Sequence, residues 1–464
     1  MTNRPRGCLH IDELSQLVAD GQIDTVLAVF PDLYGRLMGK RITATFFLEQ
    51  TLGAGMHACD YLLTVDMEMD VVEGYEFANW ASGYGDIHCV PDLSTLRQIS
   101  WLERSAMVLC DLHTPDHELV PEAPRSMLRQ QLHALAEAGY AAKVGTELEF
   151  YLFKDSYDEA TAKRYQDLET SGSYIEDYHI LQGTKSEAYH GAVRRQMDAS
   201  GIPIEFSKGE WGPGQHEINL RYAGALEMAD RHVIYKHGCK EIAWQQDVSV
   251  SFMAKWDSEL AGSSMHLHLS LWDPEISTNQ FVGDVRIDTQ TALGVSPLFR
   301  HFLGGWMKHA PELMPFYAPY PNSYKRYIHQ SWAPTVLGWS RDNRTAGFRI
   351  VGDGPSLRIE CRIPGADANP YLAMAATIAA GMDGIEKRHE PPPIFEGDVY
   401  GAAELPRVCT TLHEAIDAMD SAAFLRQTFS DRVVDHYLHF FRTEQLKSDQ
   451  AVTTWERARY FERG

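Results

Sequence analysis

The sequence has no closely spaced pair of cysteines. Its seven cysteines lie far apart, at positions 8, 59, 89, 110, 239, 361 and 409, and no CxxC motif occurs. Zinc ribbons and redox motifs need such pairs, and small disulfide scaffolds need a far higher cysteine density. We therefore expect reduced thiols in a cytoplasmic protein.

Positive charge and long apolar runs are also scarce. The 42 lysines and arginines face 64 aspartates and glutamates, and this net charge of −22 argues against nonspecific binding to nucleic acid or anionic membranes. The longest run of small apolar residues, Leu372–Met382, is interrupted by Thr377 and Gly381 and is too short to span a bilayer. The N-terminal segment MTNRPRGCLHIDEL lacks the apolar stretch of a signal peptide. An anionic substrate would need local cations, either arginines or metal ions.

Neither standard phosphate-binding loop is present. The segment GRLMGKR at 35–41 is one residue too short for a Walker A motif, and GYGDIH at 83–88 lacks the third glycine of a dinucleotide fingerprint. Any bound nucleotide must therefore be held in another way.

The chain is long enough to bury a large core. Its 464 residues, 44% of them hydrophobic, predict one large or two unequal domains. The turn-like PDLYG between segments 26–30 and 35–42 predicts a β-hairpin, and the loop-like segment 115–124 predicts a boundary between domains at 1–115 and 120–464. Residues 154–205 are expected to form loops and short helices. A short helix is expected at 11–19, and further helices at 125–138, 223–246, 296–309, 371–387, 411–420 and 422–445.

Charged residues alternate with apolar ones in four strand-like segments. In KVGTELEFYLF at 143–153, Glu147 and Glu149 share one face of the predicted strand, roughly 6–7 Å apart. Three later segments alternate in the same style between apolar residues and Glu, His or Arg. They are GQHEINLRY at 214–222, SMHLHLSLW at 264–272 and SLRIECRIP at 356–364.

Two interpretations of these segments compete. Each could be the solvated face of an antiparallel sheet, which is commonly polar. Such a face usually mixes Lys, Thr, Ser and Glu, however, whereas these faces carry Glu, His and Arg almost exclusively. If the strands share a sheet, the converging carboxylates need cations to neutralise them, and glutamates with an imidazole suit Mg²⁺ or Mn²⁺. With arginines for anionic groups, the pattern predicts a divalent-metal site for phosphoryl transfer.

Six motifs with these residues follow one another along the chain: GTELEF, GEWGPGQHE, GSSMHLHLSL, NSYKR, RDNRTAGFRI and RIECRIPGADANPYL. Together they resemble the glutamine synthetase family, in its bacterial type I-like branch. The segments at 30–41 and 85–97 resemble that family's N-terminal part, so the resemblance covers nearly the whole chain. It implies an α+β fold with a small N-terminal β-grasp domain and a large C-terminal catalytic α/β domain. It also implies a homo-oligomer, a double-ringed dodecamer with sites between neighbouring subunits and a C-terminal helical tail.

The resemblance further implies roles for individual residues. One metal ion is assigned to Glu149, Glu210 and Glu217, and a second to Glu147, His266 and Glu360. The nucleotide side is assigned to His268, Ser270, Arg349, Arg358 and Tyr222. Glutamate binding is assigned to Gly262, Arg326 and Arg362, and stabilisation of the transferring phosphoryl group to Arg344. The implied reaction uses ATP and two or more Mg²⁺ or Mn²⁺ ions to join the γ-carboxylate of glutamate to an amine through γ-glutamyl phosphate.

The sequence departs from the family where the amine would bind. Glutamine synthetases carry a glutamate on the loop after NSYKR, whereas this chain reads QSWAP and has Trp332 there. An indole cannot accept a proton, although its face attracts a cation. A second acidic residue of the ammonium site is expected in the N-terminal part, where motif position favours Asp86 over Glu73 and Glu76. Ala261 replaces an asparagine that contacts glutamate in the family.

These losses predict a changed amine substrate. The pattern resembles the γ-glutamyl-amine ligases of the family, which use ethanolamine or polyamines. We favour a small monoamine such as ethanolamine, and we expect Trp332 and Trp80 to form the apolar wall of its binding site. A polyamine would need acidic residues such as Glu73 and Glu76, and ammonia remains the substrate if Trp332 is tolerated. A non-catalytic structural oligomer is a remote alternative, because all six metal positions are kept. Tyr400 is expected to be a plain surface tyrosine rather than a modification site.

Overall fold

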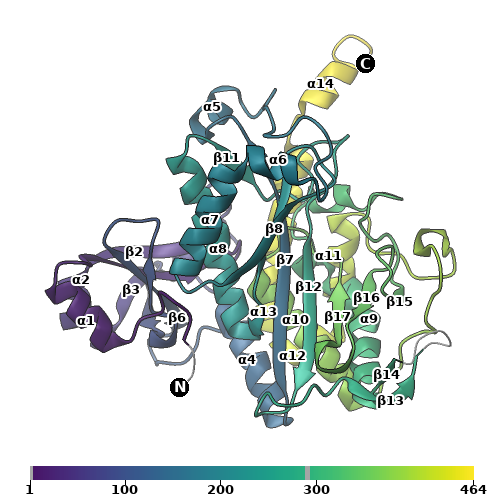
Figure 1. The fold of residues 1–464 in the computed structure, drawn as a ribbon, viewed down its shortest axis with the longest axis horizontal. Helices are drawn as coiled ribbons and strands as arrows, with labels where there is room; N and C mark the ends of the chain where they lie inside the picture. Colours follow the sequence, from purple (N-terminus) through teal and green to yellow (C-terminus); the bar gives the residue numbers. More distant parts are fainter. Residues whose placement is uncertain (1–3, 288–292) are drawn as a thin grey trace.

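The computed structural model describes residues 4–287 and 293–464, and most of their strands belong to two β-sheets (Figure 1). A six-stranded sheet uses strands up to His113, and a nine-stranded sheet uses strands from Ala141 onward. Each sheet lies on its own side of the predicted boundary at 115–124. The arrangement is the α+β fold expected from the sequence.

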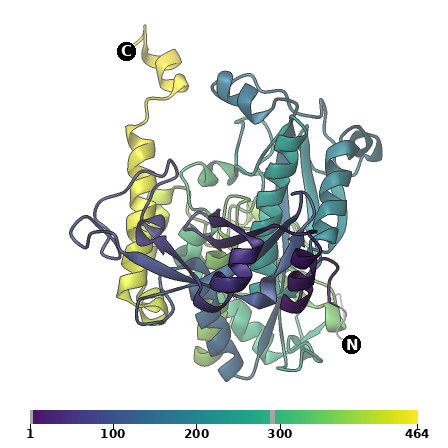
Figure 2. The ribbon, with the colours of Figure 1, turned by 90° about the vertical axis from the view of Figure 1, so that its left-hand side faces the viewer.

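The small sheet contains the predicted hairpin. Strands β1 and β2 pair antiparallel, with Phe30 opposite Met38, and Gly35 in the turn between them has a φ of 76°, which favours glycine. GRLMGKR therefore lies in a turn and a strand rather than in a phosphate loop. Figure 2 shows this sheet facing the viewer. The strands, in the order β2-β1-β6-β4-β3 with β5 beside β6, are β1 Thr25–Pro31, β2 Leu37–Thr43, β3 Met56–Cys59, β4 Asp86–Pro91, β5 Arg97–Ile99 and β6 Ser105–His113.

The large sheet brings all four charged segments together. His266 lies opposite Glu147, Glu217 opposite Glu149, and His268 opposite Glu360. The order along the sheet is β15-β16-β17-β12-β7-β9-β8, and β10 and β11 also pair with β7. The strands are β7 Ala141–Phe153, β8 Ile204–Gly209, β9 Gln215–Leu220, β10 Ala223–Gly224, β11 Ser249–Ser251, β12 Met265–Trp272, β15 Trp339–Arg341, β16 Phe348–Val351 and β17 Arg358–Cys361.

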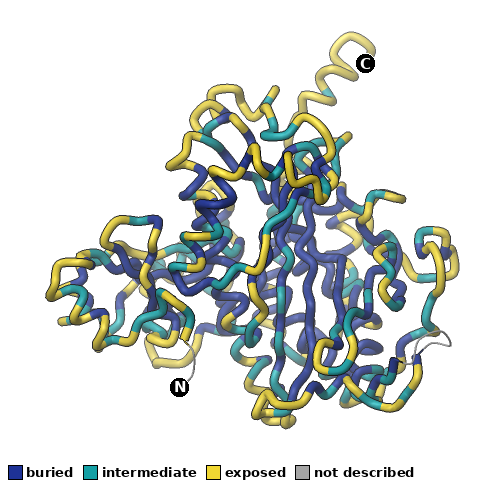
Figure 3. Tube along the Cα trace, viewed as in Figure 1, coloured by how far each residue is buried: buried dark blue, intermediate teal, exposed yellow. Residues whose placement is uncertain are grey.

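Helices cover the apolar face of this sheet, so the charged face is left open. Leu148, Leu267 and Ile359 are buried on the helical side, because alternate residues of a strand point to opposite faces. The central strands are buried along most of their length (Figure 3). Helix α10 is buried at nearly every position and packs on α9, α4 and α8. These helices are α4 Pro124–Glu137, α8 Ala225–Gln245, α9 Pro297–Tyr317 and α10 Pro370–Lys387.

Two predicted helices differ from those observed. The single helix expected at 422–445 is two helices, α12 Ala423–Phe429 and α13 Asp431–Gln450, because Ser430 has a φ of 77° and its side chain accepts a hydrogen bond from the backbone of Val433. The helix expected at 296–309 continues as α9 to Tyr317, through Pro311 and Pro315. Each proline removes a backbone donor, but burial of the following apolar side chains against the core offsets that loss.

The two sheets are joined by an ionic network at the start of α4. The guanidinium of Arg125 lies 2.8 Å from Asp92 of the small-sheet region and 2.9 Å from Asp230 of α8.

Among the helices of residues 4–287 and 293–464, none combines the length and the apolar character that a membrane span needs. The remaining α-helices and strands of the described residues are α1 Ile11–Ala19, α2 Ala44–Phe46, α3 Leu52–Ala54, α5 Tyr157–Ala162, α6 Ile180–Lys185, α7 Glu187–Ala199, β13 Val282–Arg286, β14 Gly294–Val295, α11 Leu412–Asp420 and α14 Thr454–Tyr460. Helix α14 projects from the body of the molecule (Figure 1).

Candidate active site

A cavity of about 630 Å³ lies over the charged face of the large sheet. Its floor is formed by β7, β9 and β12, and its rim by loops that include residues 177–178, 211 and 331–333. A second cavity of about 490 Å³ adjoins it. The two form one continuous cleft, because they share Glu147, Phe206, Asn219, His268 and Arg358.

Three glutamates converge at one end of the floor. Glu149 of β7, Glu210 directly after β8 and Glu217 of β9 each offer a carboxylate oxygen, and these oxygens lie within 4.8 Å of one another. Lys208 pairs with Glu210, and the side-chain amide of Asn219 donates to Glu217 at 2.6 Å. This is the first metal set predicted from the sequence.

The electrostatics of this trio fit a divalent cation. Burial and the charge of Glu210 raise the pKa of Glu149 to about 7. Burial, together with Glu147 and Glu210, raises the pKa of Glu217 well above its usual range. A single lysine does not neutralise three carboxylates, and an all-oxygen ligand set is typical of Mg²⁺ or Mn²⁺ sites.

A second group of possible ligands lies beside the first. Glu147, His268 and Glu360 offer atoms within 4.8 Å of one another, and His266 Nδ1 lies 3.0 Å from Glu147 and 3.7 Å from Glu360. Burial opposes ionisation of Glu147, but His268 and His266 hold its pKa well below the usual range. Burial likewise opposes ionisation of Glu360, but Arg362 and the two histidines lower its pKa to about 2. The structure brings Glu147 and Glu360 together, but the histidine grouped with them is His268, which was predicted for the nucleotide side, while the predicted ligand His266 lies beside them.

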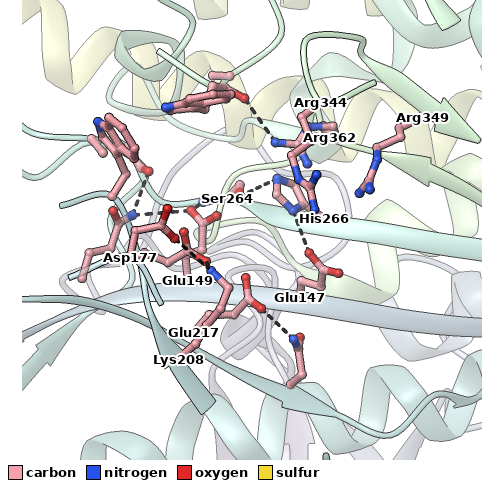
Figure 4. Close-up of a pocket in the computed structure, with 18 of the residues that line it drawn as sticks. Glu147, Glu149, Asp177, Lys208, Glu217, Ser264, His266, Arg344, Arg349 and Arg362 are labelled. Carbon is pink, nitrogen blue, oxygen red and sulfur yellow. Dashed lines mark hydrogen bonds and ion pairs between the residues drawn. The ribbon is translucent and has the colours of Figure 1, made fainter. Parts of the chain in front are cut away.

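Arginines face these carboxylates across the cavity. Figure 4 shows Arg344, Arg349 and Arg362 on the side opposite Glu149 and Glu217. Arg349 and Arg362 bind the two oxygens of Glu360, at 2.8 and 2.7 Å. Arg344 lines the cavity and is exposed, so its guanidinium is free to meet an anionic ligand.

The predicted glutamate-binding residues form a tight corner of the cavity. Arg326 and Arg362 are buried, and the Nε atom of each has no hydrogen-bond partner among residues 4–287 and 293–464. Both arginines also line the cavity, so their guanidinium groups are suited to a carboxylate ligand there. A Cβ atom at Gly262 would lie 2.4 Å from Cγ of Arg326, so only glycine leaves room for this arginine.

The second cavity has the character of a base-binding pocket. Tyr222, Ser270 and Arg358, all predicted for the nucleotide side, line it together with the apolar Val144, Leu220 and Leu269. Lys143 lies 3.3 Å from the ring centroid of Trp272 at the same wall. The cavity therefore combines apolar side chains with cations, as a nucleoside phosphate requires.

Aromatic loop residues form the rim of the first cavity. Trp332 and Trp211 meet edge to face with centroids 5.7 Å apart, and each is 46% exposed. Trp332 has a φ of 65°, a strained conformation for an aromatic residue. Tyr400 is half-buried rather than a plain surface tyrosine, because its hydroxyl donates to the carbonyl of Ala333 at 2.8 Å and anchors this loop.

Some predicted residues lie elsewhere, and some cavity residues were not predicted. Asp86, at the start of β4, does not line either cavity of its own chain, and neither do Glu73, Glu76 and Trp80 of the preceding loop.

Three residues that line the first cavity were not predicted from the sequence: Lys208, Asp177 and Trp211. Lys208 and Trp211 flank Glu210 in the GEWGPGQHE region, which is a usable signal, whereas nothing in the sequence around Asp177 marks it.

Comparison with known proteins places this cleft in a family. Residues 121–460 match the family model described as glutamine synthetase, catalytic domain. Gamma-glutamylethanolamide synthetase GlnA4 of Streptomyces coelicolor is 45% identical over 455 residues, which cover 98% of this chain and 96% of that protein. Glutamate–isopropylamine ligase of a Pseudomonas species is 36% identical, over 95% of each chain.

Solved structures agree with these sequence matches. GmaS without ligand superposes with a TM-score of 0.84 at 27% identity, covering 97% of this chain and all of that one. A complex of GmaS with ADP has the same TM-score and identity and covers 99% of that chain.

Proposed function

Because the chain belongs to the glutamine synthetase family, we propose that it joins the γ-carboxylate of glutamate to a small primary monoamine such as ethanolamine. It is an ATP-dependent carbon–nitrogen ligase by that membership. The observation that carries the proposal is the pairing of two intact sets of metal-ligating side chains with an aromatic rim at the family's ammonium position.

Two divalent ions, Mg²⁺ or Mn²⁺, fit the floor of the cleft. Glu149, Glu210 and Glu217 would hold one, and Glu147, His266 and Glu360 the other, with His268 beside them. Bound there, the ions would offset the charge of the ATP phosphates and make the terminal phosphorus a better electrophile.

The arginines of the cavity would bind two different anionic groups, a carboxylate of glutamate and the transferring phosphoryl group. Arg326 and Arg362 are buried cations that line the cavity and would bind a carboxylate of glutamate. Arg344 and Arg349 lie where they can stabilise negative charge on the transferring phosphoryl group. A γ-carboxylate oxygen bonds to the terminal phosphorus of ATP and ADP leaves. The amine nitrogen then bonds to the γ-carbon, and phosphate leaves.

The amine must lose a proton before it attacks, and Asp177 is suited to accept it. Its carboxylate lines the cavity 3.7 Å from Lys208, and burial raises its pKa above the usual aspartate value. Trp211 and Trp332 supply the apolar wall that ammonia does not need. The names of two relatives, a γ-glutamylethanolamide synthetase and an isopropylamine ligase, support a monoamine.

The alternatives have less support. A polyamine needs several acidic groups along a channel, and Glu73 and Glu76 lie outside both cavities of their own chain. They and Asp86 would act only on a neighbouring subunit's site, as the expected dodecamer allows. That assembly, the domain limits 1–115 and 120–464, and a cytoplasmic location remain predictions from the sequence.

A panel of amines tests the proposal. Phosphate-free enzyme, glutamate, ATP and Mg²⁺ are combined with ammonium, ethanolamine, isopropylamine, putrescine or spermidine, and ADP formation is measured. We expect the highest kcat/KM with a small monoamine. Trp211→Ala should lower that value and raise the relative use of ammonium. Trp244→Ala, an exposed tryptophan outside both cavities, is the matched control.

Each other outcome has a definite meaning. Turnover with ammonium alone would contradict the role given to Trp211 and Trp332. Preference for putrescine or spermidine would support the polyamine alternative. Absence of amine-dependent ADP formation with every amine would favour a structural oligomer.

A further inference from the structure

A third group of metal-ligating side chains lies outside the cleft. His309 of α9, Asp383 of α10 and His389 just beyond α10 offer ligand atoms within 4.8 Å of one another. None of the three lines either cavity. The proposed reaction therefore gives this group no role.

The spacing of the atoms matches a small coordination sphere. Nε2 of His309 lies 2.8 Å from Oδ2 of Asp383, and Nε2 of His389 lies 3.3 Å from the same oxygen. Ligands at the usual Zn–N distance in a tetrahedral site are about 3.3 Å apart. His309 and Asp383 are buried, whereas the side chain of His389 is 22% exposed, so an ion can enter and retain water.

Neighbouring groups hold the two histidines in this position. Nδ1 of His309 lies 2.7 Å from the carboxylate of Glu312, an arrangement that aims Nε2 at a metal. The ring of His309 also stacks on Phe424 with centroids 4.0 Å apart. Arg388 takes a left-handed conformation, and the backbone N–H of His389 then donates to the carbonyl of Gly384, which turns the chain back onto α10.

Two lysines compete for this group, but they do not block it. Lys387 lies 2.5 Å from Oδ1 of Asp383 and leaves Oδ2 to the histidines. Lys308 contacts Nε2 of His389 at 2.9 Å and would have to move. Lys308 is exposed on the helix surface, so its flexible side chain can turn into solvent.

We propose that His309, Asp383 and His389 bind one divalent transition-metal ion of the Zn²⁺ class, with water as the fourth ligand. Two imidazoles and one carboxylate suit Zn²⁺, whereas the mainly carboxylate sets of the cleft suit Mg²⁺ or Mn²⁺. The ion links α9 to the end of α10, at the beginning of the connector that contains PPP at 391–393. Its role is structural, and it is independent of the proposed reaction.

Metal binding by the full-length protein tests this. The protein is treated with a chelator, returned to excess Mg²⁺ to fill the catalytic sites, and titrated with Zn²⁺. Bound metal is then counted, and Tm is measured. The wild type should retain one Zn²⁺ per chain and gain thermal stability, while His389→Ala and Asp383→Asn should retain none and gain nothing. Turnover in Mg²⁺ should be unchanged in His389→Ala.

Matched controls separate this site from others. His301→Ala removes another α9 histidine, which contacts Glu390 and not the cluster, and it should still bind one Zn²⁺. Glu149→Gln should also keep the ion, because it alters only the catalytic floor. Cobalt(II) in place of zinc should give strong tetrahedral visible bands that the His389→Ala variant lacks.

Three results would overturn the proposal. The first is a wild type that retains no Zn²⁺ in excess Mg²⁺. The second is equal retention by wild type and His389→Ala. The third is strong tetrahedral cobalt bands that persist in Asp383→Asn. If His389→Ala does not fold, Asp383→Asn, which keeps the shape of the side chain, decides the question by the same count.

Discussion

The floor and the rim of the cleft are built differently. The floor carries its charged groups on paired strands, where Glu149 opposite Glu217 and His266 opposite Glu147 are held by the sheet's register. The rim carries Asp177, Trp211 and Trp332 on loops, and both tryptophans are half exposed. Strands hold catalytic groups more rigidly than loops do, whereas loops accept substitution without disturbing the core.

This difference separates two tasks. The floor would activate glutamate with ATP whichever amine follows, so its residues should affect every amine alike. The rim would select the amine, so its residues should change preference and leave glutamate activation intact. Substitutions in each region can break or sharpen this division.

The largest effect is expected at the floor. Glu149→Ala removes one carboxylate of the first metal set and should lower kcat with every amine by roughly 1000-fold, the upper range for loss of one electrostatic contact. ADP formation with each amine of the panel measures this. A variant with wild-type turnover would contradict the assignment of Glu149 as a ligand.

A smaller loss, of apparent affinity for glutamate, is expected at the corner formed by Arg326, Arg362 and Gly262. Arg326→Lys keeps the charge but cannot reproduce the planar fork of donors, so KM for glutamate should rise by roughly 100-fold. The relative use of different amines should stay the same. A change in amine preference without a change in glutamate KM would show that this corner belongs to the rim's task.

A substitution in the rim should change amine preference and leave the KM for glutamate unchanged. Trp332→Glu introduces a carboxylate where the indole lies, and the ratio of ammonium to monoamine kcat/KM should rise by up to roughly 30-fold, the value of a strong cation–π contact. Glutamate KM should stay within experimental error. An unchanged amine profile would count against any selective role for this loop.

The smallest expected effect is a pH dependence of the apparent Mg²⁺ affinity, which arises from the floor and not from the rim. With a pKa of about 7 before metal binding, Glu149 is mostly ionised at pH 8 and mostly protonated at pH 6. Protons then compete with Mg²⁺, so the apparent Mg²⁺ affinity should fall roughly tenfold from pH 8 to pH 6. Turnover at varied Mg²⁺ measures this, and equal affinity at both pH values would contradict it.

The fold was predictable where local pattern and packing agree. The helix at 11–19 and the hairpin of β1 and β2 follow from periodicity and turn residues. The break at Ser430 and the continuation of α9 through Pro311 did not follow. The continuation of α9 depends on burial against other elements, which outweighs local propensity. The break depends on the positive φ of Ser430, which its residue type does not predict.

The candidate site shows the same limit at the level of single residues. Alternation of Glu and His with apolar residues predicted a divalent-metal site, because strand geometry puts such residues on one face. The division into two ligand sets, and the inclusion of Glu210, came only from the family resemblance. Asp177 could not be predicted in this way, because it lies on a loop, where the sequence shows no periodic pattern. His309, Asp383 and His389 also carry no sequence signal, because two helices bring them together.

The sequence by itself determined the chemistry of the floor and the family to which the chain belongs. Residue type and strand spacing are local properties, and six ordered motifs preserve them. Only the tertiary structure decided which loop residues share the cleft and which helical side chains meet outside it. Such contacts join distant parts of the chain, and packing rather than sequence spacing brings their atoms within reach.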